Sequence, residues 1–460
     1  MFNEGKGKSG RNLYTMPWAY YGGMTPEDKE ALIAALREVP AVGNVVPRPR
    51  SSSERRPAGL AVRDISCTKY RMPSPYREEH DHFRNTVRQY CLKELAPYAD
   101  TWEEAELFPN EVFKRAGDLG LFAAHYPEEQ GGAGGDYWFS IAKAEELPKC
   151  GSAGVSMGLL VQGDMATPVI SDLGTKEQIE EFLTPAIKGE KIAALGVSEP
   201  NAGSDVAGIQ TWAKRDGDDW IVNGSKTYIT NGTRADFVTL LVKTNPEAGA
   251  HGCSFFLVPT KTKGFSVAKK LKKMGNHASD TAELAFEDMR VPQRYMLGQP
   301  NQGFMYLMQN FQAERLIACA SAVGGMQLAI DEAIAYGRER KAFGKPIIKR
   351  EYWQHKFVDL QTKVEAAKAL TYKAAEMFNE ERYVKKETIS FESVKIISMA
   401  KIFVGELGSE VIDQCLQFHG GAGYMDEYRI SRAFRDQRLL RIGGGTTETM
   451  RYYVAKLMGL

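Results

Sequence analysis

A single carboxylate stands inside the apolar stripe of a long helical segment, residues 304–325. The positions that would share one helix face are four, three and four residues apart: Leu307, Phe311, Glu314 and Ala318. Burial among apolar neighbours raises the pKa of a carboxyl group, and a raised pKa suits a general base that works near neutral pH. Glu314 is therefore a candidate base. An ion pair with a neighbouring helix is the alternative interpretation of the same pattern.

Two short stretches carry hydroxyls and glycines in a pattern typical of a polar cofactor edge. The first, GVSEPNAGSDVAG (196–208), offers the hydroxyls of Ser198 and Ser204. The second, TYITNG (227–232), places Tyr228 and Thr230 at the end of a strand-like run. Hydroxyls and free N–H groups in one loop bind anionic or polar groups. A solvated connector and a hairpin end are the alternatives.

The glycines near the end of the chain predict a close approach to the backbone. Gly443, Gly444 and Gly445 interrupt an apolar run, and glycine costs backbone entropy unless nothing larger fits. Neither this triplet nor the pair at 420–421 follows a strand in a G-x-G-x-x-G pattern, which argues against a Rossmann domain. The cations of RERKAFGKP (338–346) can be explained as a helix C-terminus.

The composition is that of an ordinary globular protein. The chain has 460 residues, 43% hydrophobic and 25% charged, with a formal net charge of +1. The balanced charge gives no reason to expect a nucleic-acid partner, and without an 18-residue apolar run we predict no transmembrane segment. The six cysteines are scattered singly, so we expect neither a metal site nor a disulfide framework, and we infer a reducing compartment.

The order of the elements predicts an α+β protein. Residues 1–75 are expected to be a mobile N-terminal extension, and 76–195 an α-helical domain. Alternating residues predict a central, barrel-like β-domain over 196–303, with a two-residue hairpin turn at Asn223-Gly224. Helical periodicity over 304–460 predicts a C-terminal bundle, with helices at 304–340, 350–380, 388–418 and 446–458.

Six segments, in this order, resemble the acyl-CoA dehydrogenase family of flavoproteins over residues 76–460. They are SEPNAGSD, WIVNGSKTYITNG, KMGNHASDTAELAFEDMRVP, ERLIACASAVGGMQLAIDEAIAYGRERKAFGKP, LQFHGGAGYMDEY and the GGGT turn. The resemblance implies an N-terminal α-helical domain, a β-domain and a C-terminal four-helix bundle. It also implies FAD as cofactor and a homotetramer.

The resemblance assigns roles to individual residues. Flavin contacts would come from Val197, Ser198, Ser204, Tyr228, Ile229 and Thr230, and Thr446 and Glu448 would also contact FAD. A neighbouring subunit would supply the adenosine side through Arg340, Phe343, Gln417, Gly420 and Gly421. The acyl-CoA would lie along Ser204, Gln312, Ala313, Arg315, Gly444 and Gly445.

The position of the catalytic base separates subsets of the family. In many relatives the glutamate stands in a Tyr-Glu-Gly-Thr turn, where this chain has Gly444. A subset resembling long-chain acyl-CoA and isovaleryl-CoA dehydrogenases has it in an E-R-L sequence on the first bundle helix, and Glu314-Arg315-Leu316 has that form. The resemblance thus implies Glu314 as the base, with Glu448 as the rival.

The implied function is FAD-dependent α,β-dehydrogenation of a fatty acyl-CoA to the trans-2-enoyl-CoA in fatty acid β-oxidation. Electrons would pass to an electron-transfer flavoprotein, and the compartment would be a bacterial cytoplasm or a mitochondrial matrix. A flavin-dependent oxidase or monooxygenase on the same fold is the first alternative. A non-enzymatic relative that binds nucleic acid is the second.

Overall fold

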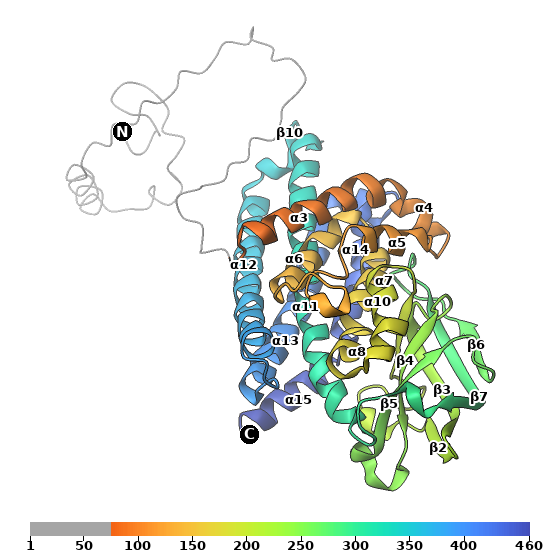
Figure 1. Cartoon of the computed structure of the whole chain (residues 1–460). Helices are drawn as coiled ribbons and strands as arrows, with labels where there is room; N and C mark the ends of the chain where they lie inside the picture. The colour runs from red at the N-terminus through yellow and green to blue at the C-terminus, as the bar shows by residue number, and fades with distance from the viewer. Residues whose placement is uncertain (1–74) are drawn as a thin grey trace, which may run out of the picture. The chain divides into compact units, whose positions relative to one another are not determined.

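The computed structural model describes residues 75–460, so the predicted N-terminal extension lies, except for Pro75, outside the described residues. Within them the predicted order is confirmed: a helical domain, a central β-sheet and a C-terminal helical domain. Figure 1 shows the strands gathered beside the helices, with α11 running between the two helical parts.

Short helices build the N-terminal domain, because Gly, Pro and Ser interrupt its apolar runs. They are α3 (Glu78–Tyr90), α4 (Ala99–Glu104), α5 (Glu111–Asp118), α6 (Trp138–Glu146), α7 (Ala153–Leu160), α8 (Pro168–Leu173), α9 (Lys176–Gln178) and α10 (Thr184–Ile187). Ser152 caps α7, since its side chain accepts a hydrogen bond from the Val155 N–H at 3.2 Å. A π-helical turn, Val161–Met165, extends α7.

The central sheet has the strand order β6-β7-β3-β2-β4-β5-β8, with β1 beside β4. Its strands are β1 (Ala193–Gly196), β2 (Trp212–Asp216), β3 (Asp219–Thr230), β4 (Phe237–Lys243), β5 (Cys253–Pro259), β6 (Phe265–Lys270), β7 (Thr281–Pro292) and β8 (Met296–Leu297). Most pairs are antiparallel, whereas β1 and β2 run parallel to β4. β4 and β5 are buried along nearly their whole length, which their continuous apolar runs require.

The prediction of a hairpin turn at Asn223-Gly224 is wrong. Both residues lie within β3, and the turn falls at 217–218, where Asp216 pairs with Asp219. Gly224 instead serves a register shift against β7, with φ of 140°. A Cβ at Gly224 would lie 2.6 Å from Thr211 Oγ1, so glycine is required there by crowding.

The C-terminal domain is a bundle of long helices. They are α11 (Gly303–Glu339), α12 (Glu351–Asn379), α13 (Phe391–His419), α14 (Arg429–Gln437) and α15 (Thr447–Leu457), with a small hairpin of β9 (Lys341–Ala342) and β10 (Lys345–Pro346) after α11. The first three helices pack against one another, and α11 also packs on α6. Helix α14 lies between the predicted helices at 388–418 and 446–458, in a segment for which the periodicity gave no prediction.

Helix α11 alone, among the described residues, is long and apolar enough to cross a membrane by length and composition. Half of its most apolar window is buried inside the protein. Its packing against α6, α12 and α13 accounts for that composition, because a helix in the centre of a bundle is apolar on several sides.

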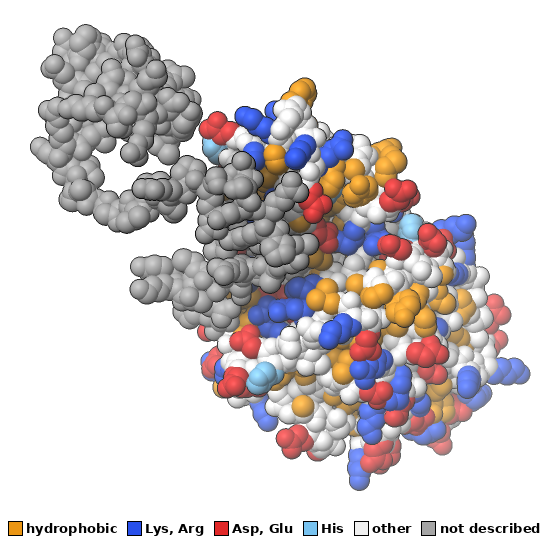
Figure 2. All heavy atoms as spheres, turned by 90° about the horizontal axis from the view of Figure 1, so that it is seen from above, with side chains coloured by type: hydrophobic (Ala, Val, Ile, Leu, Met, Phe, Trp, Pro, Cys, Tyr) orange, Lys and Arg blue, Asp and Glu red, His pale blue; other side chains and the backbone are white. Residues whose placement is uncertain are grey.

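Figure 2 shows acidic and basic side chains interspersed over the face seen from above.

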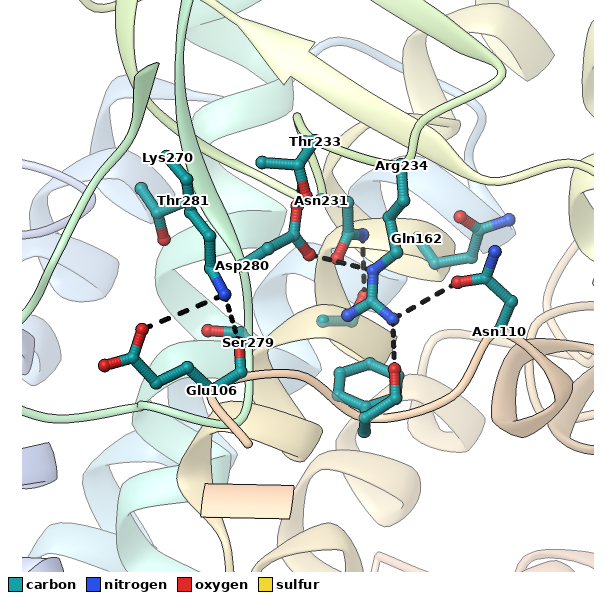
Figure 3. A network of polar contacts seen from close by, with 12 residues as sticks. Glu106, Asn110, Gln162, Asn231, Thr233, Arg234, Lys270, Ser279, Asp280 and Thr281 are labelled. Carbon is teal, nitrogen blue, oxygen red and sulfur yellow. Dashed lines mark hydrogen bonds and ion pairs between the residues drawn. The ribbon is translucent and has the colours of Figure 1, made fainter. Parts of the chain in front are cut away.

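A polar network around Arg234, which forms a buried ion pair within the β-domain, connects the β-domain to the N-terminal domain (Figure 3). Arg234 Nε donates to Asp280 Oδ1 at 2.8 Å, and Arg234 Nη1 donates to the Phe108 carbonyl at 2.5 Å. The guanidinium also lies 4.0 Å from the centre of the Phe108 ring. Asp280 accepts from the N–H and hydroxyl of Thr233 as well. This network holds the segment that follows β3 in place. The last residues of β3 line a cavity between the domains.

Candidate active site

A cavity of about 1010 Å³ lies where the three domains meet, and most of the predicted site residues line it. Its walls come from α7, the ends of β1 and β3, one face of α11, α14 and the glycine turn. The predicted residues among its lining are Val197, Ser198, Ser204, Tyr228, Ile229, Thr230, Glu314, Arg315, Gly444, Gly445 and Thr446. The structure therefore brings together stretches that are up to 250 residues apart in the chain.

The loop at 196–208, which carries the hydroxyls of Ser198 and Ser204, is anchored by a buried ion pair. Lys226 Nζ donates to Glu199 Oε1 at 2.7 Å and to the Val197 carbonyl at 3.0 Å. Glu199 also accepts from the backbone N–H groups of Gln210 and Thr211. Burial lowers the pKa of Lys226 to about 8, and Glu199 opposes that shift. The loop is thus held rigidly although its tip at Gly203 and Ser204 is exposed.

A bulge in β3 points Tyr228 out of the sheet. The pairing of β3 with β7 shifts register between Lys226 and Ile229, and Tyr228 has φ of 62°. Its side chain is 72% exposed and borders the cavity. The Thr227 N–H donates to the Ser198 carbonyl at 2.9 Å, which ties this bulge to the first loop. Bulges commonly re-aim side chains beside functional sites.

One face of α11 forms a wall of the cavity, and of the four residues predicted to share a face, Phe311, Glu314 and Ala318 lie on that wall whereas Leu307 is buried away from it. The face carries Phe304, Met308, Phe311, Glu314, Arg315, Ala318, Ser321, Ala322 and Gly325. The residues before Glu314 are bulky, and those after Arg315 are small. Gln312 and Ala313 lie on the buried side instead and do not line the cavity. The Ala313 carbonyl accepts from the Tyr137 hydroxyl, and Gln312 Oε1 accepts from Arg315 Nη1.

Glu314 is the carboxylate of this wall. The residue is partly accessible because it borders the cavity, but its Oε2 atom is buried and has no hydrogen-bond partner among the described residues. Burial raises the pKa of Glu314, and the positive charges of Arg315 and Lys401 oppose that rise. An unpaired buried carboxylate beside a cavity has the character of a general base. Among residues 75–460, no ion pair joins Glu314 to another helix, which was the alternative interpretation.

The glycine turn closes over this carboxylate. Gly444 and Gly445 have φ of 67° and 97°. A Cβ at Gly444 would lie 3.5 Å from Glu314 Oε1, and one at Gly445 would lie 2.5 Å from Met450 Cε. Arg315 Nε donates to the Gly444 carbonyl at 3.1 Å. The N–H groups of Gly444 and Gly445 donate to no backbone oxygen in residues 75–460, which leaves them for a ligand.

Thr446 and Glu448 differ in their relation to the cavity. Thr446 caps α15, since its Oγ1 accepts from the Thr449 N–H at 3.2 Å, and it borders the cavity. Glu448 is exposed and does not border it. Hydrogen bonds from its own N–H and from Thr446 lower the pKa of Glu448. A lowered pKa and exposure make Glu448 a poorer base than Glu314.

The residues expected to hold the adenosine of a neighbouring subunit lie away from this cavity. Arg340, Gly420 and Gly421 border a second hollow of about 700 Å³. Phe343 is 95% exposed, and Gln417 is exposed as well. The structure therefore separates these five residues from the flavin loops of the same chain.

The donor set of the first cavity is suited to a flavin cofactor. Ser198, Ser204 and Thr230 offer hydroxyls, Tyr228 offers an exposed ring, and a Cβ at Gly203 would have no atom within 4 Å. These groups match a flat aromatic ring with a polar edge and an anionic tail. In the described part of the chain, no group of three His, Cys, Asp or Glu residues could hold a metal ion, and the five described cysteines are buried and unpaired.

Sequence reasoning missed Lys401, which approaches Glu314 from α13. The signal was present, because Ile397, Lys401, Val404 and Gly408 repeat the four, three, four spacing that identified Glu314. All four are buried in α13. Lys226 and Glu199 were also missed, since each looks solvated when its own strand or loop is considered alone.

Comparison with known proteins gives consistent matches along the described chain. Models of the N-terminal, middle and C-terminal domains of acyl-CoA dehydrogenases match residues 77–190, 194–289 and 301–459. A mitochondrial long-chain specific acyl-CoA dehydrogenase of Rattus norvegicus is 39% identical over 435 residues, 92% of this chain and 97% of that protein.

Two solved structures have the same fold. Butyryl-CoA dehydrogenase of Megasphaera elsdenii matches with a TM-score of 0.80 at 32% identity, over 85% of this chain and 100% of that one. A glutaryl-CoA dehydrogenase of Mycobacterium smegmatis, in complex with FADH2, matches with a TM-score of 0.77 at 27% identity, over 84% of this chain and 96% of that one.

Proposed function

The chain belongs to the acyl-CoA dehydrogenase family, and on that premise we propose that it converts a fatty acyl-CoA to the trans-2-enoyl-CoA with Glu314 as the base. Membership makes the chain an oxidoreductase acting on CH–CH bonds in fatty acid oxidation, with acyl-CoA thioesters as substrates and FAD as cofactor. The enzyme class and cofactor expected from the sequence are thereby confirmed.

The position of the Glu314 carboxylate is the observation that supports the proposal. It projects from α11 into the cavity, is desolvated, and lies beside the turn at Gly444. Glu314 takes the α-proton of the bound thioester as that C–H bond breaks. FAD, when bound, supplies the acceptor for the hydride that leaves the β-carbon. Holding the base against one face of the acyl chain gives the proton transfer its favourable geometry.

The glycine turn is suited to the charge that develops on the thioester oxygen. Removal of the α-proton shifts negative charge onto that oxygen, and preorganised donors stabilise it. The N–H groups of Gly444 and Gly445 are free for this role, and the absence of side chains lets the thioester approach them. Arg315 holds the Gly444 carbonyl and so fixes the orientation of the turn.

We further propose a preference for long acyl chains. Beyond Glu314, the α11 wall continues to Gly325, which is about 16 Å at 1.5 Å per residue. The cavity-lining side chains of α11 beyond Arg315 are small, and the N-terminal domain contributes small residues to the same lining, Gly151, Ser152, Ala153 and Ser156, together with larger apolar ones such as Met157 and Leu160. An extended acyl tail needs such a slot, because every methylene that stays dry adds binding energy.

The expected partners complete the proposal. Arg340, Phe343, Gln417, Gly420 and Gly421 are separated from the flavin loops of their own chain, which supports a homotetramer in which they serve a neighbouring subunit's FAD. An electron-transfer flavoprotein would reoxidise the enzyme, in a bacterial cytoplasm or a mitochondrial matrix. Relatives come from both kinds of source.

Replacing the base tests the proposal. Glu314→Gln should retain FAD yet reduce the rate of anaerobic flavin bleaching by acyl-CoA by about 10² to 10⁴ fold, the usual contribution of a general base. Glu448→Gln is the matched control, because it removes the rival carboxylate from an exposed position. Near-normal bleaching by Glu314→Gln, or its loss in Glu448→Gln with FAD still bound, would overturn the assignment.

The choice of electron acceptor separates the proposal from its alternative. After reduction by acyl-CoA, the enzyme should pass electrons rapidly to an electron-transfer flavoprotein and slowly to oxygen. Rapid reoxidation by oxygen, with hydrogen peroxide or an oxygenated product, would instead support a flavin-dependent oxidase or monooxygenase.

A further inference from the structure

Lys401 is a buried ammonium that the catalytic scheme above does not use. It lies on α13 with 2% of its surface exposed, in the apolar stripe that faces α11. Its Nζ donates to the carbonyl of Leu440 and to the carbonyl of Gly445, at 3.5 Å for the second. These partners among the described residues are backbone oxygens rather than a carboxylate. Burying a lysine without a directly bonded anion is costly, so a reason for its presence is needed.

The glycine turn is held from two sides by cations. Lys401 reaches it from α13 through Leu440 and Gly445, and Arg315 reaches it from α11 through the Gly444 carbonyl. The turn has no side chains with which to hold itself, and two of its residues have positive φ. Charge-assisted hydrogen bonds to its carbonyl oxygens therefore fix the backbone that faces the cavity.

Lys401 also lies close to the Glu314 carboxylate. A Cβ atom added at Gly444 would lie 3.5 Å from Glu314 Oε1 and 3.8 Å from Lys401 Cε. The two side chains thus flank the same empty volume. Burial lowers the pKa of Lys401, and the negative charge of Glu314 opposes that shift. In the same way, the positive charge of Lys401 opposes the rise that burial causes in the pKa of Glu314.

Other charged or titratable groups face this pair from each neighbouring element. Arg315 and Cys319 belong to α11, and Tyr453 of α15 acts on Arg315. Burial raises the pKa of Cys319 to about 12, so its thiol stays neutral. Arg315 is a permanent cation. Lys401 is therefore the second positive charge near the Glu314 carboxylate, and it comes from a different helix.

We propose that Lys401 is a positioning residue for the reaction: it anchors the glycine turn and supplies the positive charge that keeps the Glu314 carboxylate ionised in its desolvated place. The inference rests on the proposed function, because it presumes that Glu314 is the base. Burial raises the pKa of this carboxyl, and the positive charges of Arg315 and of Lys401, which lies across Gly444, oppose that rise. The same ammonium holds the turn whose N–H groups are the proposed donors to the thioester oxygen.

The test separates charge from anchoring. Lys401→Gln keeps N–H donors for the carbonyls of Leu440 and Gly445 but removes the charge, whereas Lys401→Arg keeps the charge. Lys363→Met is the matched control, since it removes one positive charge at an exposed site on α12 where Lys363 pairs with Glu410. For each FAD-loaded variant, the rate of anaerobic flavin bleaching by acyl-CoA is measured across pH.

Loss of the charge at 401 should move the rising limb of the pH profile to higher pH. The direction follows because removing a nearby cation destabilises the carboxylate, so the base remains protonated until a higher pH. A shift of one pH unit corresponds to about a tenfold slower reaction at pH values below the limb. We expect at least that shift for Lys401→Gln, and profiles close to the parent for Lys401→Arg and Lys363→Met. A Lys401→Gln profile that coincides with the parent would overturn the proposal.

A second measurement does not depend on turnover. The carboxyl stretch of Glu314 is followed by infrared difference spectroscopy during a pH titration, with Glu314→Gln identifying the band. The band should titrate at higher pH in Lys401→Gln than in the parent, even if that variant bleaches slowly or binds FAD weakly. An unchanged titration contradicts the role of Lys401. Full activity of Glu314→Gln contradicts the proposed function itself, so the two failures are distinguishable.

Discussion

The carboxylate proposed as the base should destabilise the folded protein, and Glu314→Gln should therefore be more stable than the parent at alkaline pH. Burial raises the folded-state pKa of Glu314 above the value of about 4.3 in an unfolded chain. For an acid shifted in this direction, stability is highest below the unfolded pKa and falls as pH rises through the folded pKa. The amide has nearly the same shape and stays neutral, so it avoids this loss.

The expected gain follows from the environment of the buried atom. Each unit of pKa elevation corresponds to about 1.4 kcal/mol of lost stability once the carboxyl ionises. The Oε2 atom has no hydrogen-bond partner, so the ionised carboxylate carries a larger desolvation penalty than the neutral amide that would replace it. We therefore expect Glu314→Gln to gain about 1–3 kcal/mol near pH 8 and much less near pH 4.

Thermal unfolding of the FAD-loaded protein, followed by flavin fluorescence across that pH range, measures the difference. Comparison at each pH removes effects common to both proteins, and Glu448→Gln controls for the loss of one negative charge at an exposed position. The reasoning would be refuted if the melting temperatures of Glu314→Gln and the parent stayed parallel from pH 4 to pH 8, or if the variant lost stability as the pH rose.

Three further substitutions probe the walls of the cavity. Ser321→Phe should block the slot beyond Glu314 and lower kcat/KM at least tenfold for long acyl-CoAs relative to short ones, as steady-state assays with graded chain lengths would measure. Lys226→Met should destabilise the protein by about 3–5 kcal/mol in denaturant titrations and loosen FAD, because it leaves Glu199 buried and unpaired; adding Glu199→Gln should restore most of the loss. Gly224→Ala should cost about 1–3 kcal/mol in the same titrations, because its Cβ would collide with Thr211.

Periodicity predicted the framework and one wall of the site. The helices at 304–340, 350–380, 388–418 and 446–458 correspond closely to α11, α12, α13 and α15. The spacing around Glu314 correctly placed that residue on the face that borders the cavity. These successes share a cause, since a long amphipathic helix carries its packing direction in its own sequence.

Features that depend on contacts between distant segments were not predictable in this way. Asn223-Gly224 has the composition of a hairpin turn, but the pairing of β3 with β2 and β7 places it inside a strand. The outward turn of Tyr228 depends on a register shift against β7. Lys401 shows the opposite case, because its spacing within the apolar stripe of α13 is visible in the sequence, whereas the backbone carbonyls that it contacts belong to a distant segment.

The central claim is that the Glu314 carboxylate removes the α-proton of a bound acyl-CoA. The most direct measurement uses an acyl-CoA analogue with sulfur in place of the β-carbon, which cannot lose a hydride, and follows deuterium entry at its α-carbon by NMR in D₂O. We predict rapid exchange with the parent and with Glu448→Gln, and exchange at least about 10² fold slower with Glu314→Gln. Exchange by Glu314→Gln at the parent's rate would contradict the account.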